Sequence, residues 1–159
     1  MFERIITALV LVAVVLSCMF ATKSQYPMFA LMVVAAGVAG YEWFKLMPRK
    51  CKNVIKPMAW GYGLLTAALS ALALYYWDVA LLLWSASILT WLLSIYWVKT
   101  YPDYDGWYNV SLHGIGIVLV SAAVTAIFSV WLNSPWWLMY LFLLVWGADS
   151  GCLLYTSDA

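Results

Sequence analysis

Long apolar runs separated by short polar stretches dominate the chain, and their length predicts membrane-spanning helices. A helix that crosses the hydrocarbon core of a bilayer, about 30 Å thick, needs about 20 apolar residues. We therefore expect an all-α, polytopic membrane protein with about six transmembrane helices. The first five runs cover about residues 5–21, 27–47, 57–77, 79–98 and 110–132, and the sixth opens at Asn133-Ser134-Pro135, where an N-cap precedes a proline, and reaches Asp149.

Two of the predicted breaks between helices are inferred from turn-forming residues. The stretch from Pro57 to Val98 contains a single charged residue, Asp78. One helix of that length would be about 60 Å long, about twice the membrane thickness. We therefore expect the chain to fold back at Tyr76-Trp77-Asp78, with Asp78 as a solvated turn residue. The polar stretch 99–108 contains Pro, Asp and Gly, which are turn formers, and so predicts a loop.

The composition excludes a water-soluble protein. Of the 159 residues, 67% are hydrophobic and 9% are charged, whereas soluble domains have roughly 45–50% and about 25%. The net charge of +1 and the thinly spread basic residues argue against nucleic acid as a partner. The cysteines, Cys18, Cys51 and Cys152, show neither zinc-ligand nor disulfide spacing. We expect lipids or small molecules as partners.

Basic residues predict the orientation, because short cytoplasmic loops are enriched in Lys and Arg. With six helices, Lys23 lies alone on one side, and the other seven basic residues lie opposite. The amino terminus and Asp149 are then both cytoplasmic. A signal peptide ending near Cys18 is an alternative for the first segment. The length of the apolar run and the acidic Glu3 favour a retained helix.

Few polar residues fall inside the apolar runs. Glu42 and Lys45 are three residues apart, so they share a helix face and can form an interfacial ion pair. His113 is the only histidine and is expected to be a packed residue rather than a ligand. Close helix packing is the expected role of four glycines: Gly61, Gly63, Gly114 and Gly116.

Asp149 is the strongest candidate for chemistry. It lies near the end of an apolar helix and is followed by Ser150, so a carboxylate and a hydroxyl reach the cytoplasmic membrane face together. Such oxygen ligands suit Mg²⁺, which binds through one or two carboxylates plus substrate phosphates. An interfacial aspartate without a chemical role is the competing interpretation.

The segment LLVWGADSG at 143–151 resembles one found in bacterial phosphatidate cytidylyltransferases, the CDP-diacylglycerol synthases. RIITALVL at 4–11 and AGYEWFKL at 39–46 are similar to that family's amino-terminal opening and to its Ala-rich helix ending in Glu-Trp. The likeness between Met47 and about Tyr140 is one of hydropathy only. This resemblance implies a multi-pass enzyme of the bacterial inner membrane that joins phosphatidate to CTP, giving CDP-diacylglycerol and pyrophosphate with Mg²⁺ as cofactor. It implies catalytic roles for Asp149 and Ser150, with Asp149 as the metal ligand.

The end of the chain departs from that family, whose members continue after GADSG into a Lys-rich loop and further helices. Residues 152–159 resemble instead the translation of a transposon-end adapter used in sequencing libraries. We expect residues 1–151 to be the amino-terminal transmembrane part of the enzyme, a truncated helical bundle, and 152–159 to be a non-native tail. This polypeptide alone is then expected to have no cytidylyltransferase activity.

Three other classes of protein compete with this interpretation. A small six-helix transporter or channel subunit would be expected to show repeat symmetry and broken helices near the bilayer midplane, and we find no such repeat. Another CTP-dependent enzyme, similar to polyprenol or dolichol kinases, is the nearest enzymatic alternative. A membrane scaffold without a site would require the WGADSG match to be a coincidence. The sequence leaves the oligomeric state open, a homo-oligomer included.

Overall fold

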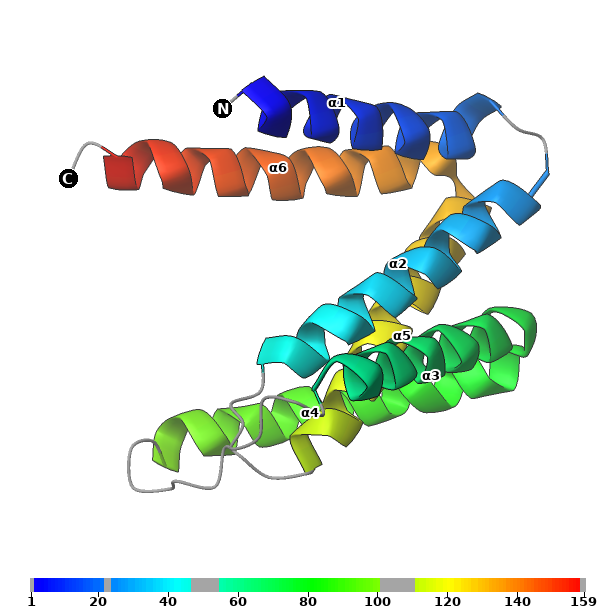
Figure 1. Cartoon of the computed structure of the whole chain (residues 1–159), viewed down its shortest axis with the longest axis vertical. Helices are drawn as coiled ribbons and strands as arrows, with labels where there is room; N and C mark the ends of the chain where they lie inside the picture. The colour runs from blue at the N-terminus through cyan, green and yellow to red at the C-terminus, as the bar shows by residue number, and fades with distance from the viewer. Residues whose placement is uncertain (1, 22–23, 47–54, 101–110, 158–159) are drawn as a thin grey trace. The chain divides into compact units, whose positions relative to one another are not determined.

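The computed structural model describes residues 2–21, 24–46, 55–100 and 111–157. These residues form six α-helices and one π-helical turn, η1, which continues the first helix (Figure 1). The expected all-α class is therefore confirmed for the described part of the chain. In order, the elements are α1 (Phe2–Leu16), η1 (Ser17–Ala21), α2 (Tyr26–Leu46), α3 (Ile55–Tyr75), α4 (Trp77–Thr100), α5 (Ser111–Asn133) and α6 (Pro135–Ser157).

The turn between α3 and α4 is shorter than predicted. Only Tyr76 separates the two helices. Its N–H donates to the Leu72 carbonyl at 2.8 Å, and its own carbonyl accepts from the N–H of Val79 at 3.1 Å. Asp78 is therefore exposed in the first turn of α4 rather than in a turn between helices. A carboxylate is favourable there because the amino-terminal end of a helix carries partial positive charge.

Parts of the predicted loops lie outside the described residues. Lys99 and Thr100 belong to the last turn of α4, where the Thr100 hydroxyl donates to the Tyr96 carbonyl at 3.1 Å. The remainder of the predicted 99–108 loop is not described, and neither is the basic stretch 48–52. At the other predicted turn, the Ser134 carbonyl accepts from the N–H of Trp137 at 3.1 Å, and Pro135 is the first residue of α6, as expected.

Four helices of the described chain, α2, α3, α4 and α5, are long and apolar enough to cross a membrane. The apolar part of the first segment, Ile6–Ala21, is shorter, and α6 is not among the four. The predicted number of six helices is thus confirmed for the described chain, and four of the six are candidate membrane spans. That the first and last helices also cross the membrane stays a prediction. The four candidate spans indicate an integral membrane protein.

Side-chain burial in these helices follows the pattern expected in lipid. Large apolar residues are exposed along α4, where Leu89, Trp91 and Leu92 are each about 60% accessible. The buried positions are instead enriched in small residues, such as Ala36, Ala59, Ala73, Ser70 and Ser121. Lipid tails cover large apolar side chains at no cost, whereas small residues let helix backbones approach.

The chain divides into two compact units. The terminal unit comprises Met1–Lys23 and Ile127–Ala159, and the central unit comprises Ser24–Ala126. In the terminal unit, the Trp131 indole N–H donates to the Met19 carbonyl at 3.2 Å, and the rings of Phe20 and Trp136 lie 5.1 Å apart. These contacts join η1 to the end of α5 and the start of α6.

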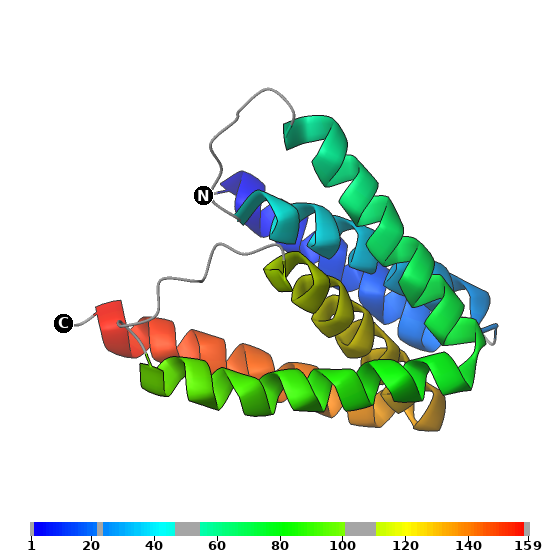
Figure 2. The same ribbon diagram turned by 90° about the horizontal axis from the view of Figure 1, so that it is seen from below.

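The central unit is built on the contact between α2 and α3 (Figure 2). A Cβ atom added to Gly63 would lie 2.7 Å from the Gly37 carbonyl oxygen, and one added to Gly40 would lie 2.5 Å from the Thr66 hydroxyl. The helix backbones approach this closely only because these positions carry no side chain. Gly63 and Gly116 therefore have the packing role predicted from the sequence, whereas Gly61 and Gly114 face open space.

We expect Gly63→Leu to destabilise the central unit by about 1–3 kcal/mol, because the new side chain must displace the backbone of α2. Gly61→Leu, two residues earlier on the same helix, is the matched control, since nothing lies within 4 Å of a Cβ at that position. Thermal unfolding of both variants in detergent micelles, followed by circular dichroism, measures the difference. Equal melting of the two variants would contradict the packing role.

Candidate functional site

Asp149 lies on α6, within the terminal unit, and its side chain is exposed. The sequence placed the end of this helix near Asp149, whereas α6 continues to Ser157 (Figure 1). A single glycine at 151 does not end a helix, and the apolar residues that follow it can continue the helix. Ser150 follows within the same helix, and its side chain lies outside the described residues.

Asp149 lies partway along α6 rather than at its end. The helix begins at Pro135 and carries the exposed Trp136 and Trp137 in its first turn. Tryptophans in such pairs favour the membrane interface. Asp149 follows 14 residues after Pro135, which corresponds to about 21 Å of helix, less than the hydrocarbon thickness of about 30 Å. Although α6 is not among the helices of the described chain that could cross a membrane, an ionisable side chain partway along an apolar helix is typical of a functional site.

A complete metal site is not formed by the described residues. Among them, no group of three or more His, Cys, Asp or Glu side chains is placed to hold a metal ion. Asp149 supplies one carboxylate, and Mg²⁺ bound by one or two carboxylates takes its remaining oxygens from substrate phosphates and water. Asp149 is therefore a single carboxylate ligand for such an ion rather than part of a complete protein-built site among the described residues.

The ion pair between Glu42 and Lys45 that the sequence predicts is formed. Lys45 Nζ lies 3.0 Å from one carboxylate oxygen of Glu42 and 3.2 Å from the other. Both side chains are about half exposed, and Lys45 also lies over the Tyr41 ring, 5.0 Å from its centroid. The three residues thus form a charged patch near the carboxyl end of α2.

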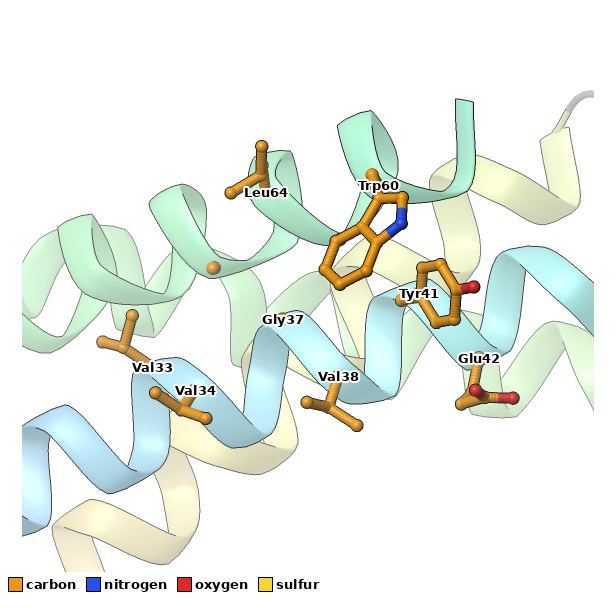
Figure 3. A pocket seen from close by; sticks show the side chains of 10 residues that line it. Val33, Val34, Gly37, Val38, Tyr41, Glu42, Trp60 and Leu64 are labelled. Carbon is orange, nitrogen blue, oxygen red and sulfur yellow. The ribbon is translucent and has the colours of Figure 1, made fainter. Parts of the chain in front are cut away.

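An apolar groove with a volume of about 520 Å³ lies between α2 and α3 and ends at this patch (Figure 3). The sticks in Figure 3 place Val33 and Val34 toward one end of the groove and Tyr41 and Glu42 toward the other. We call this feature the α2–α3 groove. Its lining residues are Val33, Val34, Gly37, Val38, Tyr41, Glu42, Trp60, Gly63, Leu64 and Ala67.

His113 is packed among aromatic rings at the start of α5. Its ring centroid lies 5.0 Å from that of Phe44 and 5.8 Å from that of Tyr62. The Tyr62 hydroxyl donates to the His113 carbonyl, and the Trp43 indole N–H donates to the Leu112 carbonyl at 3.4 Å. Two helices therefore hold the start of α5, and the expectation that His113 is a packed residue is confirmed.

Side-chain hydrogen bonds join α5 to α3 and α4, and the sequence did not predict them. The Ser70 hydroxyl of α3 donates to the Ser121 hydroxyl of α5 at 3.0 Å, and the Trp84 indole of α4 donates to the Thr125 hydroxyl of α5 at 3.0 Å. Small polar residues inside apolar runs were the available signal, since such groups need partners in lipid. The pairing itself cannot be read from one sequence.

The model of the cytidylyltransferase family matches residues 2–155. No curated protein and no solved structure matches the chain.

We expect Tyr62→Phe to cost about 1 kcal/mol of stability, because the His113 carbonyl loses a buried donor while the ring is retained. Tyr96→Phe is the control, since Tyr96 is 64% exposed on α4. Unfolding in micelles, followed by circular dichroism, compares the two variants. A loss as large for Tyr96→Phe would show that the hydroxyl at position 62 has no special role.

Proposed function

The chain belongs to the cytidylyltransferase family, and we propose that its reaction is the transfer of a cytidylyl group from CTP to phosphatidate, which yields CDP-diacylglycerol and pyrophosphate. Membership implies a nucleotidyltransferase that uses CTP and a lipid substrate. Phosphatidate as the lipid is supported by the segments at 4–11, 39–46 and 143–151 that resemble bacterial CDP-diacylglycerol synthases.

In this reaction the nucleophile is an oxygen of the lipid phosphate. It attacks the α-phosphorus of CTP, forming a new P–O bond while the bond to the bridging oxygen of the β-phosphate breaks and pyrophosphate leaves with the electron pair. The protein has little covalent chemistry to perform. Positioning of the two phosphates and neutralisation of their charge provide the catalysis in transfers of this kind.

The match of the cytidylyltransferase family to residues 2–155 carries this proposal, and the place of Asp149 partway along the apolar helix α6 supports it. A carboxylate about 21 Å from the start of an apolar helix is costly unless it is used. We propose that Asp149 holds Mg²⁺ together with the phosphates of the nucleotide and that the hydroxyl of Ser150 binds beside it. The ion would supply charge neutralisation of the triphosphate.

The distribution of the basic residues between the two sides of the membrane supports an orientation in which the reaction takes place on the cytoplasmic side. Seven of the eight Lys and Arg residues fall on the side of the amino terminus when the chain crosses six times. The carboxyl-terminal half of α6, which contains Asp149, is then directed towards the cytoplasm, the side where CTP is found. We propose the bacterial inner membrane as the location.

We expect Asp149→Asn to lower kcat by about 100-fold or more, because removal of one group that stabilises transition-state charge costs about 10²–10³ in rate. The assay measures CTP-dependent formation of CDP-diacylglycerol from phosphatidate by the protein expressed from its complete reading frame in the source DNA. Asp78→Asn is the control, because Asp78 is also exposed and lies in the first turn of another helix. Absence of CDP-diacylglycerol from the correctly folded unaltered protein would contradict the proposal.

Magnesium dependence separates a metal ligand from a merely structural aspartate. Removal of divalent ions with EDTA should stop turnover, and added Mg²⁺ should restore it. Asp149→Glu, which retains a carboxylate, should need roughly tenfold more Mg²⁺ for half-maximal rate because the ligand is displaced. An unchanged Mg²⁺ requirement would exclude Asp149 from the metal site.

A further inference from the structure

The α2–α3 groove combines an apolar channel with a pair of opposite charges at one end, and we propose that it binds one zwitterionic phospholipid. An acyl chain lies along the groove, the phosphate of the headgroup pairs with Lys45, and its ammonium group pairs with Glu42. The groove belongs to the central unit, whereas the proposed catalytic carboxylate of Asp149 belongs to the terminal unit. The proposal does not depend on the reaction that the protein catalyses.

The groove has the length of one leaflet. From Val33 to Glu42 it follows nine residues of α2, or about 14 Å of helix, which is close to half of the 30 Å hydrocarbon core. Gly37 and Gly63 contribute no side chains, and Val33, Val38, Leu64 and Ala67 make the lining apolar. One acyl chain therefore fits along the groove from the interface to the middle of the bilayer.

Aromatic residues mark the charged end of the groove as the interfacial end. The rings of Tyr41 and Trp60 lie 4.9 Å apart, and Trp60 is 63% exposed. Tyrosine and tryptophan favour the level of the lipid headgroups, where the rings are buried and the polar atoms reach water. A headgroup at this level lies next to Glu42 and Lys45.

The charges select the kind of headgroup. An anionic headgroup that approached Lys45 would also meet the carboxylate of Glu42, only 3.0 Å from the lysine nitrogen. With a zwitterionic headgroup, neither Lys45 nor Glu42 faces a like charge, because the phosphate pairs with the lysine and the ammonium group pairs with the carboxylate. The exposed ion pair contributes little to stability on its own, so its rearrangement around a headgroup costs little.

Phosphatidate fits this end of the groove less well than a zwitterionic lipid. It carries a phosphate and no ammonium group, so Glu42 would remain unpaired beside a second negative charge. Phosphatidylethanolamine carries both charges, and its primary ammonium group can donate N–H bonds to a carboxylate. It is therefore the probe we choose.

The test is a lipid competition on the whole chain. The purified protein in mild detergent is mixed with equal amounts of phosphatidylethanolamine, phosphatidylglycerol and phosphatidate of matched acyl chains, and retained lipids are counted by native mass spectrometry. We expect one phosphatidylethanolamine to be retained about tenfold more often than either anionic lipid. Preferential retention of phosphatidylglycerol or phosphatidate would overturn the proposal.

Charge variants test the pairing. Glu42→Gln removes both the ammonium partner and the repulsion of anions, so the ratio of phosphatidylethanolamine to phosphatidylglycerol should fall about tenfold. Lys45→Gln should lose retention of phosphatidylethanolamine. Asp78→Asn and Lys56→Gln change the net charge in the same ways at residues that neither line the groove nor belong to the Glu42–Lys45 pair, and they should leave retention unchanged.

A groove variant tests the acyl-chain contact. Val38→Trp fills the groove and should reduce retention, whereas Leu89→Trp, at a similarly exposed position on α4, should not. Equal retention by the groove variants and their controls would overturn the site. If a variant loses its helical signal in circular dichroism, the competition on the unaltered chain still decides between the lipids.

Discussion

Helices in a bilayer gain little from burying apolar side chains against one another, because lipid tails are as apolar as the side chains they would replace. Several contacts between the described spans reflect that constraint. Gly37 and Gly63 let the backbones of α2 and α3 approach, and hydrogen bonds between hydroxyl and indole groups join the neighbouring spans to α5. Other large side chains of α4, such as Leu89, Trp91 and Leu92, remain exposed.

The same glycines that allow close packing also shape the α2–α3 groove. Gly37 and Gly63 lie where the two helices touch, and both line the groove together with Val33, Val38 and Leu64. Its charged end follows from helix periodicity, since Glu42 and Lys45 are three residues apart and lie on the same face. Packing and the proposed lipid site thus share one structural cause.

Polar groups in the spans divide into two kinds. The hydroxyls of Ser70, Ser121 and Thr125 are buried and hydrogen-bonded, so their role in the structure is satisfied within the protein. Asp149 is exposed partway along the apolar helix α6. The proposed chemistry is assigned to this carboxylate because ionisable groups in apolar helices are typical of functional sites.

The sequence by itself determined the class of protein and most helix boundaries, because the length of an apolar run and the turn chemistry at Ser134-Pro135 are local properties. It also determined the Glu42–Lys45 pair, which depends only on the periodicity of one helix. The tertiary structure decided which glycines are contact points: Gly61 and Gly63 look alike in the sequence, but only Gly63 meets α2. It likewise decided the partners of Tyr62, Trp43 and Trp84 and the existence of the groove, because these depend on how separate helices pack and no local pattern encodes that geometry.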